Sequence, residues 1–521
     1  MYRDLFSVAG LTLLSRVTGF LRDVVLGAVL GAGLLADAFY VAFRLPNHFR
    51  AIFGEGAFNA AFVPSYSRVL ETEGAAEAKA FSSQILTLLF ASQVVLLALA
   101  WAFTPGLVRL LAPGFESDPA KFDLAVSLTR ITFPYLMCVT LATLYTGALN
   151  ANRRFAAGAF RPVLMNIAMV VALAATFLLP NAGYAAALGV CLAGVCELGW
   201  IMVAAKRADT LGALTRPRWT PDVKQFFTAL LPAVIGSAGF QIAIFADTII
   251  ASLLPTGAVS SIYYADRIYQ LPIGVIGIAA GTVLLPEMSR RFAAGDDGAA
   301  FHAQNRTMAL TIALGAPFVV AFALMPLDIM RAAFLRGRFT EEAASASAAV
   351  LSAYDFGLLA IVLIASARAS FQSRGDTRTP MMVSLAAVAL NVGLKIALYQ
   401  PFGAAGLALA TSVGAWINFG ALVFLALRQG SMRPDAILLK VCGCVAAACL
   451  ALAMVVLLGR DMAMAAANAI GFLRTEIAVS LLSGAGLVAY GVALLALFRA
   501  FGIRLARPRA TKVDAAPASE G

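Results

Sequence analysis

Long apolar runs limit what this chain can fold into more than any other feature of its sequence. About fourteen stretches are long and apolar enough for a helix to cross a membrane, which takes roughly twenty residues. Charged residues make up only 13% of the chain, against about 25% in soluble proteins. The sequence therefore predicts an all-α polytopic membrane protein and excludes a soluble or disordered one. The stretches lie at approximately 5–30, 36–61, 81–104, 122–149, 157–180, 184–205, 224–254, 258–285, 305–326, 343–367, 379–400, 404–427, 437–459 and 475–498.

The basic residues are spread over loops and do not gather in one patch. Most of the 39 Lys and Arg fall in alternate loops, on the side where the N-terminus lies. Because cytoplasmic loops are enriched in Lys and Arg, both termini are expected in the cytoplasm. The net charge of +11 therefore reports membrane topology, and no nucleic-acid partner is predicted.

A short internal repeat indicates a duplicated fold. Residues 62–68 (FVPSYSR) match residues 284–290 (LLPEMSR), and each segment follows an aromatic-rich span interrupted by proline. Both copies keep the same orientation, and transporters with parallel repeats bind substrate between the halves. Two six-helix lobes around a central cavity are therefore predicted, followed by two appended helices and a disordered cytoplasmic tail. The predicted segments are 1–206, 207–428, 429–506 and 507–521.

Several charged residues lie inside the predicted spans, where an arginine costs at least roughly 2.5–3.5 kcal/mol. Arg16 is about eleven residues from the start of its span, or roughly 16 Å at 1.5 Å per residue, so its side chain cannot reach the headgroups. Arg130 and Lys395 lie nearer span ends and are expected to reach the membrane surface without a functional role.

The remaining intramembrane charges cluster on the first two spans and the start of the eighth. A nearly balanced set of this kind fits a structural ion-pair network. It also fits a water-filled chamber in which guanidinium groups hold an anion such as phosphate, and clustering on three spans favours the chamber. The set comprises Arg16, Arg22, Arg44, Arg50 and Arg267 with Asp23, Asp37, Glu55 and Asp266.

An ordered series of motifs resembles the MurJ/MviN family of lipid II flippases. It comprises SRVTGFLRD at 15–23, ADAF at 36–39, RLPN at 44–47, EGAF at 55–58, APGF at 112–115, YYADR at 263–267 and Asp376 through Pro380. The resemblance implies a fourteen-helix fold like that of the multidrug exporters known as MATE transporters. These belong to the multidrug/oligosaccharidyl-lipid/polysaccharide exporter superfamily.

The resemblance also implies a function. The chain is expected to move lipid II from the cytoplasmic to the outer leaflet of the bacterial inner membrane by alternating access. Residues 429–506 would line a groove for the lipid tail. The expected substrate-binding residues are Arg16, Arg22, Asp37, Asn47, Arg50, Glu55, Asp266 and Arg267. Gln270 stands where the family often has Glu, which limits that position to hydrogen bonding.

The expected partners are lipid II, the phospholipid bilayer and the cell-wall synthesis machinery. No catalytic residue, metal or cofactor is expected, and transport would be driven by the membrane potential or by a monovalent cation.

Other functions remain open at this point. A flippase for another polyprenyl-linked oligosaccharide would need the same pyrophosphate chemistry. A drug antiporter is disfavoured by the arginines, because a cavity for cationic drugs should be acidic or aromatic. A membrane enzyme acting on polyprenyl phosphates would need a general base or metal carboxylates, and the only histidines, His48 and His302, lack metal-ligand spacing. A cell-wall scaffold without transport activity is the last alternative.

Overall fold

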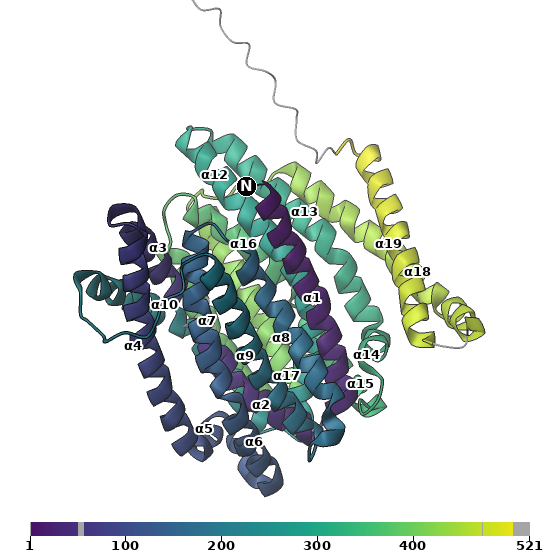
Figure 1. The fold of residues 1–521 in the computed structure, drawn as a ribbon. Helices are drawn as coiled ribbons and strands as arrows, with labels where there is room; N and C mark the ends of the chain where they lie inside the picture. Colours follow the sequence, from purple (N-terminus) through teal and green to yellow (C-terminus); the bar gives the residue numbers. More distant parts are fainter. Residues whose placement is uncertain (1, 51–56, 471–472, 504–521) are drawn as a thin grey trace, which may run out of the picture. The chain divides into compact units, whose positions relative to one another are not determined.

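The computed structural model describes residues 2–50, 57–470 and 473–503. Those residues form helices and connecting turns, with no strand among them (Figure 1). Two sequence predictions, a binding role for Glu55 and a disordered tail from 507 to 521, fall outside the described residues.

The helices reproduce the expected order of apolar stretches. In chain order they are α1 (Tyr2–Leu30), α2 (Leu34–Phe49), α3 (Ala57–Thr72), α4 (Ala75–Ala102), α5 (Thr104–Leu111), α6 (Pro119–Thr132), α7 (Pro134–Ala151), α8 (Ala156–Ala174), α9 (Ala182–Arg207), α10 (Pro221–Ser252), α11 (Ala258–Pro272), α12 (Ile278–Ala293), α13 (Asp297–Leu324), α14 (Pro326–Phe334), α15 (Glu341–Asp355), α16 (Leu358–Gln372), α17 (Arg378–Arg428), α18 (Ala436–Ile470) and α19 (Arg474–Ala500).

Within the described ranges, ten helical segments are long and apolar enough to cross a membrane. The chain is therefore a multi-pass membrane protein. One of the ten is the 51-residue α17, in which Gly403 has a non-helical φ of 56°. This left-handed residue separates the expected spans 379–400 and 404–427, because it interrupts the regular helix. The total of fourteen spans stays a prediction.

Local sequence signals explain where several helices begin. Asp118 caps α6, since its side chain accepts a hydrogen bond from the Lys121 backbone N–H at 3.2 Å, and Pro119 occupies the first turn. Asn181 caps α9 in the same way through the backbone N–H of Gly183 at 2.9 Å. Proline does not always end a helix here, because α2 continues through Pro46 to Phe49.

The chain divides into two compact units, each with its own core. One unit comprises residues 1–271, 325–357 and 384–414, and the other comprises 272–324, 358–383 and 415–521. These divisions do not follow the expected boundaries at 206 and 428, and the two lobes stay a prediction.

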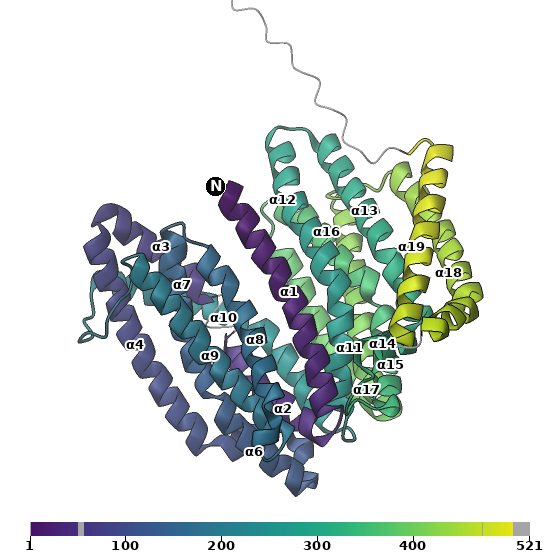
Figure 2. The same ribbon diagram turned by 45° about the vertical axis from the view of Figure 1, so that its right-hand side comes forward.

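The first unit holds the N-terminal helices. Helix α8 packs against both α1 and α9, as Figure 2 shows. A core of aromatic and aliphatic side chains joins α3, α4, α7, α9 and α10, with Phe62 stacked on Phe81 at a ring separation of 5.9 Å. A Cβ atom added at Gly19 of α1 would lie 3.4 Å from the amide nitrogen of Asn166 on α8. Gly19 of α1 therefore lies next to the Asn166 side chain of α8.

The second unit packs α13 against α16 and α18, and α18 against α19. Its core draws apolar side chains from α13, α16, the second half of α17 and α18. Helices α18 and α19 fall in the segment 429–506 and lie side by side in Figures 1 and 2, and their place as helices appended to two lobes stays a prediction.

Candidate functional site

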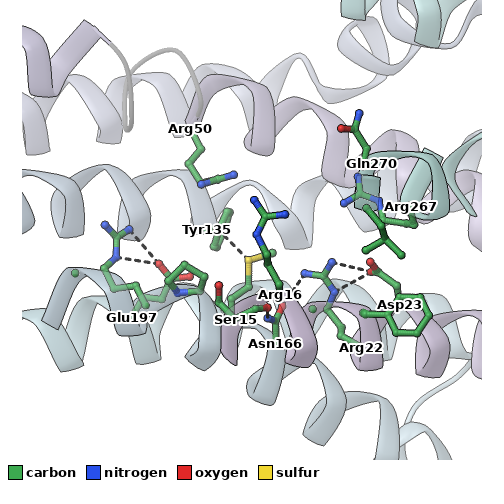
Figure 3. Close-up of a pocket in the computed structure, with 17 residues that line it drawn as sticks. Ser15, Arg16, Arg22, Asp23, Arg50, Tyr135, Asn166, Glu197, Arg267 and Gln270 are labelled. Carbon is green, nitrogen blue, oxygen red and sulfur yellow. Dashed lines mark hydrogen bonds and ion pairs between the residues drawn. The ribbon is translucent and has the colours of Figure 1, made fainter. Parts of the chain in front are cut away.

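A pocket of about 430 Å³ lies within the first unit. It is lined by residues of α1, α7, α8, α9 and α11 and by Arg50. Figure 3 shows its lining side chains. The described lining residues include the cations Arg16, Arg22, Arg50, Arg161 and Arg267 and the acids Asp23 and Glu197. The excess of arginine makes the pocket suited to an anion.

Arg22 lies on the pocket wall but most of its donors are occupied. Its Nε and Nη2 atoms donate to Asp23 Oδ1 at 3.0 and 2.7 Å, and its Nη1 atom donates to Asn166 Oδ1 at 3.0 Å. The Asn166 amide in turn donates to the Ser15 carbonyl and to Thr18 Oγ1, each at 3.0 Å. Asn166 is buried and therefore fixes the direction of Arg22.

Arg16 differs from Arg22, because its side chain is exposed and makes no hydrogen bond or ion pair with the part of the chain that the structure describes. In the view of Figure 3 it lies between Glu197 on one side and Asp23 on the other. A guanidinium group in the middle of α1 with free donors can bind a phosphate oxygen through two parallel N–H groups. Arg16 is therefore the lining arginine most available to a ligand.

The YYADR segment of α11 supplies the next part of the wall. The guanidinium carbon of Arg267 lies 4.6 Å from the centre of the Tyr263 ring, and its Nη2 atom lies 3.6 Å from Asp266 Oδ2. Tyr263 donates to Asp23 Oδ1 at 3.2 Å, which links α11 to α1. Gln270 lines the pocket and donates to Asp266 Oδ1 at 3.2 Å. The structure thus brings Asp266 and Arg267 beside the arginines of α1.

Arg50 enters the pocket from the end of α2. Its Nε and Nη2 atoms donate to Asn47 Oδ1 at 3.2 and 3.1 Å. Arg50 lines the pocket, whereas Asn47 lies behind it as a hydrogen-bond partner.

Asp37 does not line the pocket. It is fully buried near the start of α2, and its Oδ2 atom accepts from Lys121 Nζ and from the Gly257 backbone N–H, each at 2.8 Å. Its Oδ1 atom accepts from the backbone N–H and the hydroxyl of Ser260, at 2.9 and 2.8 Å. Asp37 therefore ties α2 and α6 to the end of the α10–α11 connection and to the first turn of α11. We call this set (Asp37, Lys121, Gly257 and Ser260) the Asp37 latch.

Lys395 was expected to reach the membrane surface, and that expectation is wrong. The residue is 4% exposed, and its ammonium group pairs with Asp247 of α10 inside the first unit. A buried partner offsets the cost of the charge in place. Arg130, which was treated in the same way, is exposed.

Sequence reasoning missed one side of the pocket. Tyr135, Arg161, Asn166 and Glu197 all line it, but none of them is among the expected site residues. Arg161 lies inside α8 and pairs with Glu197 at 3.0 Å. Glu197 is the only acid between Asp123 and Asp209, and a single acid in an apolar run needs a partner. That signal could have located the pair.

Across residues 2–50, 57–470 and 473–503, no group of three or more His, Cys, Asp or Glu is placed to bind a metal.

Comparison with known proteins decides the family. The family model described as "Lipid II flippase MurJ" matches residues 26–478. The chain belongs to the lipid II flippase MurJ family. One family member, described as "Probable lipid II flippase MurJ" from Rhizobium meliloti strain 1021, is 42% identical over 419 residues, or 79% of this chain and 78% of the relative. The resemblance drawn from the motifs is thus confirmed.

Solved structures show the fold of the family. The chain matches "Lipid II flippase MurJ, inward closed conformation" with a TM-score of 0.79 and 24% identity, covering 95% of this chain and 99% of that one. It matches an inward-facing multidrug resistance MATE transporter of the MOP superfamily with a TM-score of 0.65 and 15% identity, covering 82% and 98%. The predicted all-α, MATE-like fold is confirmed.

Proposed function

We propose that this chain is a lipid II flippase, a transporter and not an enzyme, and that the arginine-rich pocket binds the pyrophosphate of its substrate. The observation that carries the proposal is Arg16, an exposed cation in the middle of α1 on the wall of a pocket with more arginines than acids. Family membership supports the substrate, because the matched model and the relative from Rhizobium meliloti both bear the lipid II flippase name.

A flippase must carry the charged headgroup of its lipid across the hydrocarbon core of the membrane. A pyrophosphate between a sugar-peptide and a polyprenyl tail cannot enter hydrocarbon without a large desolvation cost. Arg16 and Arg267 present guanidinium groups to the pocket, and charge-assisted hydrogen bonds to phosphate are about twice as strong as neutral ones. The polyprenyl tail would stay in lipid along α18 and α19 while the headgroup occupies the pocket.

Transport also needs an opening at each membrane face in turn. The Asp37 latch holds the start of α2 against Gly257 and the first turn of α11 through three hydrogen bonds, and against Lys121 of α6 through a fourth. In the proposed cycle the latch closes one face while the pocket loads from the other, and it breaks when the substrate is released. This assigns Asp37 a gating role instead of direct contact with the substrate.

The cellular location of the chain, its driving force and its protein partner are part of the same proposal. The protein would lie in the bacterial inner membrane with both termini in the cytoplasm, which the Lys/Arg distribution supports. Either the membrane potential or a monovalent cation would drive transport. The cell-wall synthesis machinery would be its protein partner.

The test measures lipid II at the outer membrane face in cells depleted of the protein. Depletion should remove outward lipid II, wild type should restore it, and Arg16→Ala expressed at the same level should not. Lipid II that still reaches the outer face in depleted cells lacking any other flippase would contradict the proposal. Another polyprenyl-linked glycan would then become the substrate to test.

A further inference from the structure

The walls of the pocket differ in charge balance. One wall, from α1, α11 and the end of α2, carries Arg16, Arg22, Arg50 and Arg267 with Asp23. The facing wall, from α7, α8 and α9, carries Tyr135, Arg161, Met165 and Glu197. We call this second wall the neutral wall, because its one described cation is paired with its one acid.

The neutral wall holds its arginine firmly. The Nε and Nη2 atoms of Arg161 lie 3.1 and 3.0 Å from Glu197 Oε2. Its Nη1 atom donates to Thr146 Oγ1 at 3.2 Å, and Nη2 also donates to the Val139 carbonyl at 3.4 Å. The two side chains are 12% and 4% exposed. A fixed, neutral pair offers both donors and acceptors without attracting an anion.

The packing of α8 against α9 does not depend on the Arg161–Glu197 ion pair. Helices α8 and α9 already pack closely through small residues, since a Cβ atom added at Gly189 would lie 2.9 Å from the Cβ of Ala172. A buried ion pair also contributes little net stability, and apolar residues of similar volume often replace one without loss. The position of the pair on the pocket wall therefore needs another explanation.

We propose that the neutral wall binds the uncharged sugar and amide part of the headgroup while Arg16 binds the pyrophosphate. This rests on the proposed flippase function. Pockets of 300–1,000 Å³ hold drug-sized groups, so about 430 Å³ leaves room for more than a pyrophosphate. In this subsite Glu197 accepts from sugar hydroxyls, the second N–H of the Arg161 Nη1 atom donates to a carbonyl or ring oxygen, and Tyr135 and Met165 provide apolar contact beside them.

The test compares two lipids on purified protein in nanodiscs, namely polyprenyl pyrophosphate without a glycan and lipid II. The main variant is the double substitution Arg161→Met with Glu197→Leu, which keeps the wall neutral and filled. It should bind lipid II about tenfold or more weakly and polyprenyl pyrophosphate as wild type does. Met165→Trp, which fills the same wall without breaking an ion pair, should also weaken the binding of lipid II but not that of polyprenyl pyrophosphate. This variant keeps the test available if the double variant does not fold.

Two controls separate the inference from the proposed function. The pair Arg68–Asp222 lies outside the pocket, so Arg68→Met with Asp222→Leu should change neither affinity. Arg16→Ala should weaken both lipids, and unchanged binding of both would contradict pyrophosphate binding in this pocket. If the neutral-wall variants bind both lipids normally, or lose both equally, the glycan subsite is wrong while the flippase proposal stands.

Discussion

Arg22 of α1 donates a hydrogen bond over 3.0 Å to Asn166 of α8, a residue 144 positions later in the chain. The same Asn166 side chain donates to the Ser15 carbonyl and to Thr18. One buried amide thus determines both the direction of a pocket arginine and the contact between two helices.

Asn166→Ala should therefore impair the pocket without removing a charge. Arg22 loses one partner and α1 loses two bonds to α8, and each lost hydrogen bond of this kind costs about 1–3 kcal/mol. We expect weaker lipid II binding, measured on purified protein, and a lower unfolding temperature. Asn181→Ala, which removes the cap of α9 away from the pocket, should lower stability but leave affinity unchanged. Equal affinity in both variants would show that Arg22 needs no such support.

The two arginines of α1 should respond differently to substitution. Arg22→Ala leaves Asp23 buried without its cation, and breaking a buried pair costs about 3–5 kcal/mol. Arg16→Ala should change the free energy of unfolding by only about 0.5 kcal/mol but should abolish transport. Thermal unfolding in detergent and a flipping assay in vesicles separate the two effects. Adding Asp23→Ala to Arg22→Ala should recover stability, and a failure to recover would argue against the ion pair as the cause.

The Asp37 latch should open when its charge is removed. Asp37→Asn breaks the ion pair with Lys121 and weakens the bonds to Gly257 and Ser260. A cysteine introduced by Ser261→Cys, at a buried position of α11 beside the latch, in a background without the six native cysteines, should then react about tenfold faster with a membrane-impermeant thiol reagent. Ser117→Cys lies in an exposed turn and should react equally in both backgrounds. Unchanged reactivity at position 261 would rule out a gating role for Asp37.

An ion pair outside the membrane should make the stability of the protein weakly dependent on pH in the acidic range. Lys79 donates to Asp209 at 2.7 Å, and this hydrogen bond lowers the pKa of the Asp209 carboxyl below its usual value. The contribution of the pair is therefore complete above the usual aspartate pKa, about 3.9, and is lost as the pH falls through the lower folded value. The unfolding temperature of wild type should fall more steeply below pH 4 than that of Lys79→Met. Parallel curves would show that the pair does not contribute.

Much of the fold followed from the apolar runs. Each expected stretch with described residues corresponds to a helix or helix pair, because a span needs a minimum apolar length that periodicity and composition reveal. The internal breaks were less accurate. Pro46 does not end α2, although the interruption of α17 at Gly403 falls at the expected division between 379–400 and 404–427.

The functional site was predictable where the free-energy cost of a charge inside the membrane was enough to single out a residue. Arg16 lies too far from either end of α1 to reach water outside the membrane, and the structure places it on the pocket wall. The partners of Asp37 were not predictable, because Gly257 and Ser260 follow it by 220 and 223 residues. The Arg161–Glu197 pair was missed because neither residue is among the intramembrane charges singled out from the sequence, although an isolated glutamate in an apolar span needs a buried cation.

The bonds from Asn166 to Ser15 and Thr18 also limit how the protein can move. They fasten the middle of α1 to α8, with Gly19 of α1 next to the Asn166 side chain. The two helices should therefore move together as one rigid body, since sliding one along the other would break several buried hydrogen bonds at once. Any pivot for opening must then lie outside this pair, and the geometry of Arg22 and Asn166 should be the same at every stage of the cycle.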